Sequence, residues 1–155
     1  MAIVLEKRLN PTMGQPESPN ASREEPKLAI AVVFTSVAAT LAALKHASVL
    51  AQILDGSVTL LVPQIVPYPR PLTSPPVLID WNERRFRAIA AVSPVNTTVR
   101  LYLCRDRDET LMAFLPQRSL VVLGGPRRWW RWTSERRLAQ KLKRTGREIV
   151  FIETE

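Results

Sequence analysis

Five short apolar runs, separated by segments with helix-like spacing, constrain the fold of this chain more than any other feature. The runs are LAIAVVF, SVTLLVPQIV, TTVRLYL, SLVVLGG and REIVFIE. Continuous apolar runs of this length are typical of strands that are buried on both faces of a sheet. Because such strands alternate here with helical segments, we expect an α/β domain with a parallel sheet of five strands and helices on either side.

Capping and turn residues indicate where the four helices begin and end. Asp80 with Glu83 three residues later predicts a capping box, in which each side chain satisfies a free amide. Gly146 is expected to stop the last helix because glycine readily takes the left-handed conformation found there. The expected helices run from Ser36 to about Leu54, onward from Asp80, onward from Asp106, and from about Ser134 to Thr145.

The domain limits follow from composition. Residues 1–26 carry four prolines among polar residues, so we expect a disordered N-terminal tail, and residues 27–155 are expected to form the α/β domain. The stretch Leu28–Leu44 holds no charge, but it falls short of the roughly 20 residues of a membrane span. Its first half favours a strand and its second half a helix. We therefore expect a soluble domain rather than a membrane span.

The titratable residues limit the possible chemistry. The formal net charge is +8, which favours phosphates, nucleic acid or anionic lipid as partners, or simply a solvated basic face. Cys104 is the single cysteine, so no disulfide can form within the chain, as expected for a cytoplasmic protein. His46 is the single histidine, and no catalytic constellation is visible around either residue. We expect the protein not to be an enzyme.

The candidate ligand site lies at one edge of the expected sheet. In parallel sheets, ligands bind beyond the carboxyl ends of the strands, where the strand order reverses. Thr35 follows the first apolar run, and Gly124 and Gly125 end the fourth. These positions are therefore the natural candidates.

With this order of strands and helices, the chain resembles the universal stress protein family. The resemblance covers roughly residues 27–153 and is carried by the order of elements and by phrases such as DGSVTLLVPQIVPYPRP, SLVVLGG and LAQKLKRTGREIVFI. It implies a Rossmann-like sheet of the adenine-nucleotide-hydrolase type, with strand order 3-2-1-4-5 between four helices. It also implies homodimers formed through the last strand, with Ile149 and Phe151 as interface candidates.

The family's nucleotide motif is incomplete in this sequence. Nucleotide-binding members place an Asp after the first strand and a loop Gly-x-x-Gly, nine residues, Gly-Ser or Gly-Thr after the fourth. Here Thr35 takes the place of the Asp, and Arg127 and Arg137 stand near the second and third glycine positions. The residues that the resemblance implies for a nucleotide or anion site are Thr35, Ser36, Val62, Gly124, Gly125, Arg127 and Arg137.

Pro126 lacks an amide, and the arginine side chains occupy space in which free amides would hold a phosphate. We therefore expect ATP binding to be lost or altered, and no cofactor follows with certainty. The leading hypothesis is a non-enzymatic regulatory or interaction module. The alternative is a nucleotide or anion sensor in which the arginines pair with a phosphate or carboxylate.

The segment VVLGGPRRWWRWTSERR leaves several interpretations open. Trp129, Trp130 and Trp132 alternate with arginines. They suit simple packing over the sheet edge, a protein interface, single-stranded nucleic acid or an anionic membrane surface. A nucleic-acid accessory protein is therefore the second alternative function, and we expect nucleic acid and membrane to be less favoured partners than protein.

Overall fold

The structure is a computed structural model that describes residues 3–9, 28–117, 119–128 and 132–155. Strands and helices alternate along the chain after the first strand, as the apolar pattern predicts. The elements are β1 (Ile3–Leu9), β2 (Ala29–Val33), α1 (Val37–Leu54), β3 (Ser57–Ile65), α2 (Ile79–Ala91), β4 (Thr97–Cys104), α3 (Arg107–Phe114), β5 (Leu120–Pro126), α4 (Ser134–Arg144) and β6 (Glu148–Thr154).

One sheet runs through the molecule in the order β1-β4-β3-β2-β5-β6. The five strands from β2 to β6 are parallel, and β2 lies between β3 and β5. Counted without β1, this is the expected order 3-2-1-4-5, so the predicted fold class is confirmed. The strand order reverses at β2, which places the carboxyl ends of β2 and β5 side by side.

The N-terminal tail was predicted wrongly in part. Residues 3–9, expected to be disordered, form β1, which pairs antiparallel with β4 from Ile3 opposite Leu103 to Leu9 opposite Thr97. The prolines that suggest disorder all lie beyond residue 10, whereas IVLEKRL contains none. An unpaired β4 would also leave a row of free backbone groups at the sheet edge, and β1 covers them. Residues 10–26 of the expected tail lie outside the described residues.

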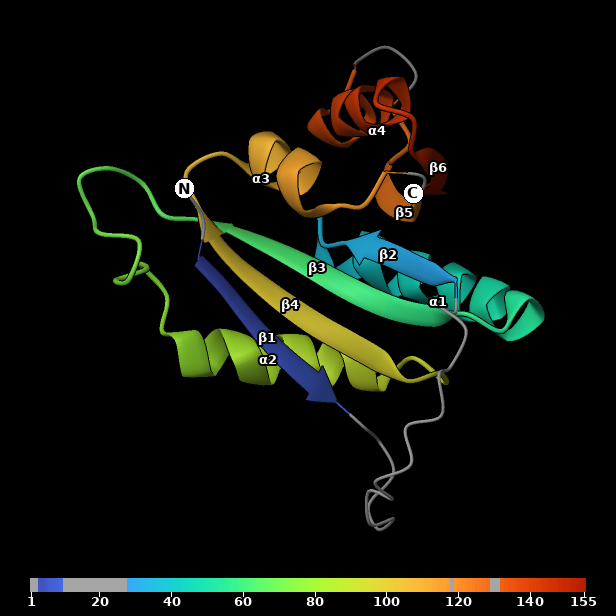
Figure 1. The fold of residues 1–155 in the computed structure, drawn as a ribbon, viewed down its shortest axis with the longest axis horizontal. Helices are drawn as coiled ribbons and strands as arrows, with labels where there is room; N and C mark the ends of the chain where they lie inside the picture. Colours follow the sequence, from blue (N-terminus) through green and yellow to red (C-terminus); the bar gives the residue numbers. More distant parts are fainter. Residues whose placement is uncertain (1–2, 10–27, 118, 129–131) are drawn as a thin grey trace, which may run out of the picture.

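Two helices cover each face of the sheet (Figure 1). α1 and α2 pack on one face, where Ala43, Leu44 and Phe86 join the side chains of β2, β3 and β4. α3 and α4 pack on the other, through Leu111 of α3 and Leu138 of α4. Successive side chains of each buried strand therefore point alternately into two separate cores, one on each face of the sheet. This explains why the strand sequences are mainly apolar.

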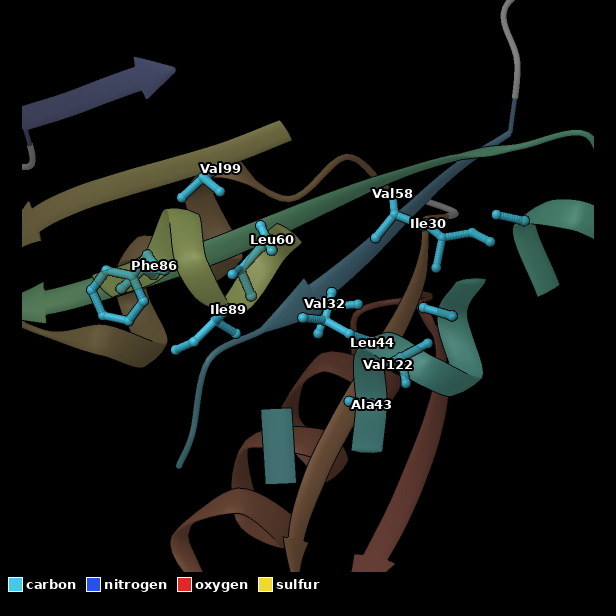
Figure 2. Packing of buried hydrophobic residues seen from close by; sticks show 14 of the residues in the cluster. Ile30, Val32, Ala43, Leu44, Val58, Leu60, Phe86, Ile89, Val99 and Val122 are labelled. Carbon is cyan, nitrogen blue, oxygen red and sulfur yellow. The ribbon is translucent and has the colours of Figure 1, made fainter. Parts of the chain in front are cut away.

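The larger core lies between the sheet and helices α1 and α2 (Figure 2). Val32 of β2 lies near Leu44 of α1, and Leu60 of β3 lies near Ile89 of α2. Val32, Leu44 and Leu60 are all at most 2% exposed. Small residues on α1, such as Ala43, let the helix approach the sheet closely. Burial of each large aliphatic side chain contributes about 1.5–3 kcal/mol, so this core is a main source of stability.

The helix caps agree with the sequence at two of the expected starts. Ser36 accepts a hydrogen bond from the Ala39 amide, and Asp106 accepts one from the Glu109 amide. The capping box predicted at Asp80 is wrong. α2 begins one residue earlier, at Ile79, which packs against the core, and its N-cap residue Leu78 has no side-chain hydrogen bond. Asp80 lies instead in the first turn, where a carboxylate favours the helix dipole.

Within the described part of the chain, one helix is long enough and apolar enough to cross a membrane. It is α1, with a mean hydropathy of 1.5. The charge-free stretch Leu28–Leu44, which by composition could be a membrane span, does not form one continuous helix. Ala29–Val33 forms β2, and α1 starts at Val37. One face of α1 is packed on the sheet. α1 is therefore a core helix of this domain, as the change of character within the stretch predicts.

Candidate ligand site at the carboxyl edge of the sheet

Thr35 joins the ends of β2 and β5. Its hydroxyl donates to the Gly124 carbonyl at 2.7 Å, and its own amide donates to Oγ1 of the buried Thr40 at 3.2 Å. A carboxylate at position 35 could not donate this hydrogen bond, since an ionised Asp only accepts. Thr35 therefore contributes to the packing of the strand ends, at the position where the resemblance expected a base-binding Asp.

The two glycines at the end of β5 are required by neighbouring elements. A Cβ on Gly124 would lie 2.3 Å from the Ala39 carbonyl oxygen in the first turn of α1. A Cβ on Gly125 would lie 2.8 Å from Cζ of Phe151 and 3.0 Å from Cβ of Glu135. The missing side chains are thus accounted for by α1, β6 and α4, independently of any ligand.

The backbone beyond Gly125 is hydrogen-bonded within the protein. Pro126 has no amide hydrogen, the Arg127 amide donates to the Thr154 carbonyl at 2.9 Å, and the Arg128 amide donates to the Pro126 carbonyl at 3.1 Å. Thr154 also donates its hydroxyl to the Gly125 carbonyl at 3.2 Å. A phosphate-binding loop needs several free amides that converge on one point. Residues 126–128 supply none.

The two arginines of the candidate site lie on exposed surface. The Arg127 side chain is 75% exposed, and its Nε lies 3.5 Å from Glu153 of β6. Glu153 also pairs with Arg136 of α4. Arg137 is exposed on α4. Arg127 is therefore directed to a carboxylate of the protein itself.

The other two candidates also have roles within the domain. Ser36 uses its hydroxyl oxygen to cap α1, accepting from the Ala39 amide at 3.3 Å. Val62 of β3 is 2% exposed and belongs to the core between the sheet and α1 and α2. The structure therefore brings Thr35, Gly124 and Ser36 together at the start of α1, whereas Val62 is enclosed in the core.

Sequence reasoning missed an aromatic cluster at the same edge. Arg85 of α2 has its Cζ 5.8 Å from the ring centroid of Phe34 and 5.6 Å from that of Trp81. Phe34 meets Phe86 edge to face at 4.9 Å. The spacing of Trp81 and Arg85, four residues apart on one helix, is the sequence signal that indicates this contact.

A second guanidinium stack fixes the proline-rich connection between β3 and α2. Arg105 lies 4.0 Å above the Tyr68 ring and donates to the carbonyls of Val66 at 2.7 Å and Arg70 at 2.8 Å. Because prolines cannot donate to a ladder, this connection takes its order from a side chain instead.

The interface candidates fall into two groups. Trp132 is 62% exposed, whereas Trp129 and Trp130 lie outside the described residues. Ile149 and Phe151 are half-buried in β6 and pack toward the core under α3 and α4.

The single cysteine and the single histidine of the chain lie on different elements, Cys104 in β4 and His46 in α1. Cys104 is buried, its thiol donates to the Gln64 carbonyl at 3.6 Å, and burial raises the pKa of that thiol above its ordinary value. His46 is exposed on α1. Among the described residues, no group of three or more His, Cys, Asp or Glu side chains could hold a metal ion.

One ion-pair network joins α3 to α4. Asp108 accepts from Lys141 at 2.8 Å and from Arg107 at 3.0 Å. Partial burial raises the pKa of Asp108, but these two hydrogen bonds outweigh it and hold the pKa below its ordinary value. The network thus keeps the N-terminal turn of α3 beside α4.

Comparison with known proteins agrees with the fold. No protein-family model and no curated protein sequence matches the chain. Among solved structures, the fold is similar to that of a universal stress protein crystallised in complex with cAMP, with a TM-score of 0.50 and 13% identity. The match covers 84% of this chain and 100% of the other. At this identity the likeness establishes the fold: an α/β domain of the type found in universal stress proteins.

Proposed function

We propose that this protein is a non-enzymatic, cytoplasmic regulatory or interaction module with the universal-stress-protein fold, and that it does not bind ATP in that family's manner. The observation that supports this most strongly is the end of β5 and the residues that follow it. The two glycines at the end of β5 accommodate α1, α4 and β6, and the amides of Arg127 and Arg128 are hydrogen-bonded to carbonyls of the protein. The triphosphate would meet arginine side chains in place of convergent amides.

Nucleotide binding provides the first test. In equilibrium dialysis with labelled ATP we expect no binding at micromolar concentrations, because the amides of Arg127 and Arg128 are already used. Labelled cAMP is measured in parallel, since the similar universal stress protein was crystallised with it. Micromolar binding of ATP would refute the proposal. Thermal protection by phosphate compounds that disappears in Arg127→Ala would instead favour the anion-sensor alternative.

The module is also proposed to be a homodimer that joins through β6. β6 pairs with β5 on one side, and its apolar residues from Ile149 to Ile152 are all partly exposed. An apolar edge strand without cover favours pairing with another strand. α1 packs against β6 and adds to the proposed surface an exposed apolar flank that holds Val49, 50% exposed, and Ile53, 73% exposed.

A charge on this flank of α1 tests the dimer. We expect Ile53→Glu to shift the protein to monomers in sedimentation velocity, because a carboxylate would be buried against the second copy without a partner. Val92→Glu is the matched control, since Val92 is 69% exposed and lies at the C-terminus of α2. A parent protein that is monomeric at high concentration, or an equal effect of both variants, would count against the dimer.

A further inference from the structure

The outer surface of α4 is strongly basic. The helix contains five basic residues and one acid, Glu135. Its apolar residues Leu138 and Leu142 are fully buried against the sheet, so the basic residues lie on the remaining faces. Arg137 and Arg144, seven residues apart, project from the same side of the helix. Both are exposed.

Part of this charge is not neutralised within the described residues. Lys141 pairs with Asp108, and Arg136 pairs with Glu153. Glu135, the acid of the helix, lies in the first turn beside Gly125. No ion pair of the described residues involves the exposed side chains of Arg137, Lys143 and Arg144. Within the part of the chain that the structure describes, the outer surface of α4 therefore carries exposed cations without an ionic partner.

An exposed tryptophan lies at the start of this surface. Trp132 is 62% exposed and directly precedes Thr133, the N-cap residue of α4. The Thr133 hydroxyl accepts from the Arg136 amide at 3.3 Å, which fixes the chain beside Trp132 relative to the helix. Trp132 thus provides an exposed indole one residue before the N-cap of the basic helix.

We propose that the outer face of α4 together with Trp132 is a binding site for single-stranded nucleic acid. Arg137, Lys143 and Arg144 would contact backbone phosphates, and Trp132 would stack on an unpaired base. α4, with 11 residues, is about 16 Å long, a length that suits the lower end of the roughly 4–16 nucleotides bound by single-strand platforms. This activity goes beyond the proposed regulatory role and does not depend on it.

Two features of α4 favour this partner over other anionic ones. A membrane-surface helix inserts an apolar face into lipid, but Leu138 and Leu142 are enclosed in the domain core. Duplex nucleic acid offers phosphates but keeps its bases stacked on one another, so Trp132 would have no base to stack on. Cations combined with an exposed indole match an unpaired strand.

The test measures fluorescence anisotropy of a labelled 15-nucleotide oligothymidine titrated with the full chain. We expect affinity to fall about 20-fold between 50 and 200 mM salt if three phosphates are neutralised. Arg137→Glu with Arg144→Glu is expected to weaken binding at least tenfold, and Trp132→Ala about tenfold through lost stacking. The matched control is Arg84→Glu with Arg87→Glu, which makes the same charge change at exposed positions of α2, on the other face of the sheet.

The outcomes separate this site from general attraction. Retained affinity in the control and loss in the α4 double variant support the proposal, with thermal unfolding showing that both variants are folded. An equal loss in both pairs would overturn it, because net charge alone would then explain binding. So would affinity unaffected by Trp132→Ala, or binding to anionic vesicles of phosphatidylserine and phosphatidylcholine without binding to the oligonucleotide.

Discussion

Replacing Gly124 by alanine is expected to reduce the free energy of unfolding by about 3 kcal/mol, at the upper end of overpacking costs. The added Cβ would lie 2.3 Å from the carbonyl oxygen of Ala39, a backbone atom that cannot rotate away. The first turn of α1 around Ala39 is also fixed by the Ser36 cap and by the bond from the Thr35 amide to Thr40. Relief therefore requires movement of the whole helix end.

Equilibrium unfolding in urea measures this loss. For Gly124→Ala we expect a lower urea concentration at the midpoint and an unchanged dependence of the unfolding free energy on urea. Gly125→Ala is the matched control at the adjacent position. The closest contact of its added Cβ would be the tip of the Phe151 ring, a half-buried side chain that can shift, and the Glu135 Cβ would follow at 3.0 Å. We therefore expect a smaller loss than in Gly124→Ala. A loss in Gly124→Ala no larger than in the control would show that helix packing does not account for this glycine.

Replacing Arg147 by leucine is expected to cost about 3 kcal/mol, because two backbone carbonyls, one in the last turn of α3 and one at its C-cap, lose a charged donor. Arg147 is 5% exposed and donates to the Met112 carbonyl at 2.9 Å and the Leu115 carbonyl at 2.6 Å. It thereby satisfies the C-terminal end of α3. Some buried ion pairs can be replaced by apolar residues without loss, but here the acceptors are main-chain atoms that remain in place.

The variant Arg147→Lys distinguishes the contribution of the positive charge from that of the planar guanidinium group. Lysine keeps the positive charge, but it cannot reproduce the planar fork that reaches two carbonyls at once. We therefore expect a loss of stability between those of the parent and of Arg147→Leu in the same urea measurement. If Arg147→Leu were as stable as the parent, the hydrogen bonds to α3 would not contribute to folding.

The larger part of the fold follows from periodicity and local chemistry. The apolar runs predict the five parallel strands because strands buried on both faces cannot alternate with polar residues. Ser36 and Asp106 predict their helix starts because their side chains satisfy amides three residues on. Gly146, at φ +90°, ends α4 as its sequence position indicates. Apolar periodicity, N-cap residues and the glycine at a helix end each depend on interactions within a few residues, so the sequence alone predicts them.

The site required tertiary information. The sequence marks Gly124 as a candidate for phosphate binding, and the structure shows the Ala39 carbonyl against it, contributed by a helix 85 positions earlier in the chain. Arg147 looks like the polar start of a strand, and its burial depends on where the end of α3 lies.

The sequence by itself determined the alternation of strands and helices, the helix caps formed by Ser36 and Asp106, and the basic character of α4. The tertiary structure decided that β1 completes the sheet beside β4, that the glycines at the end of β5 make room for α1, α4 and β6, and that Arg85 lies among aromatic rings. The physical reason is distance along the chain. Periodicity and capping are local, whereas a carbonyl, a ring or a strand edge supplied by a distant segment becomes a neighbour only when the sheet assembles.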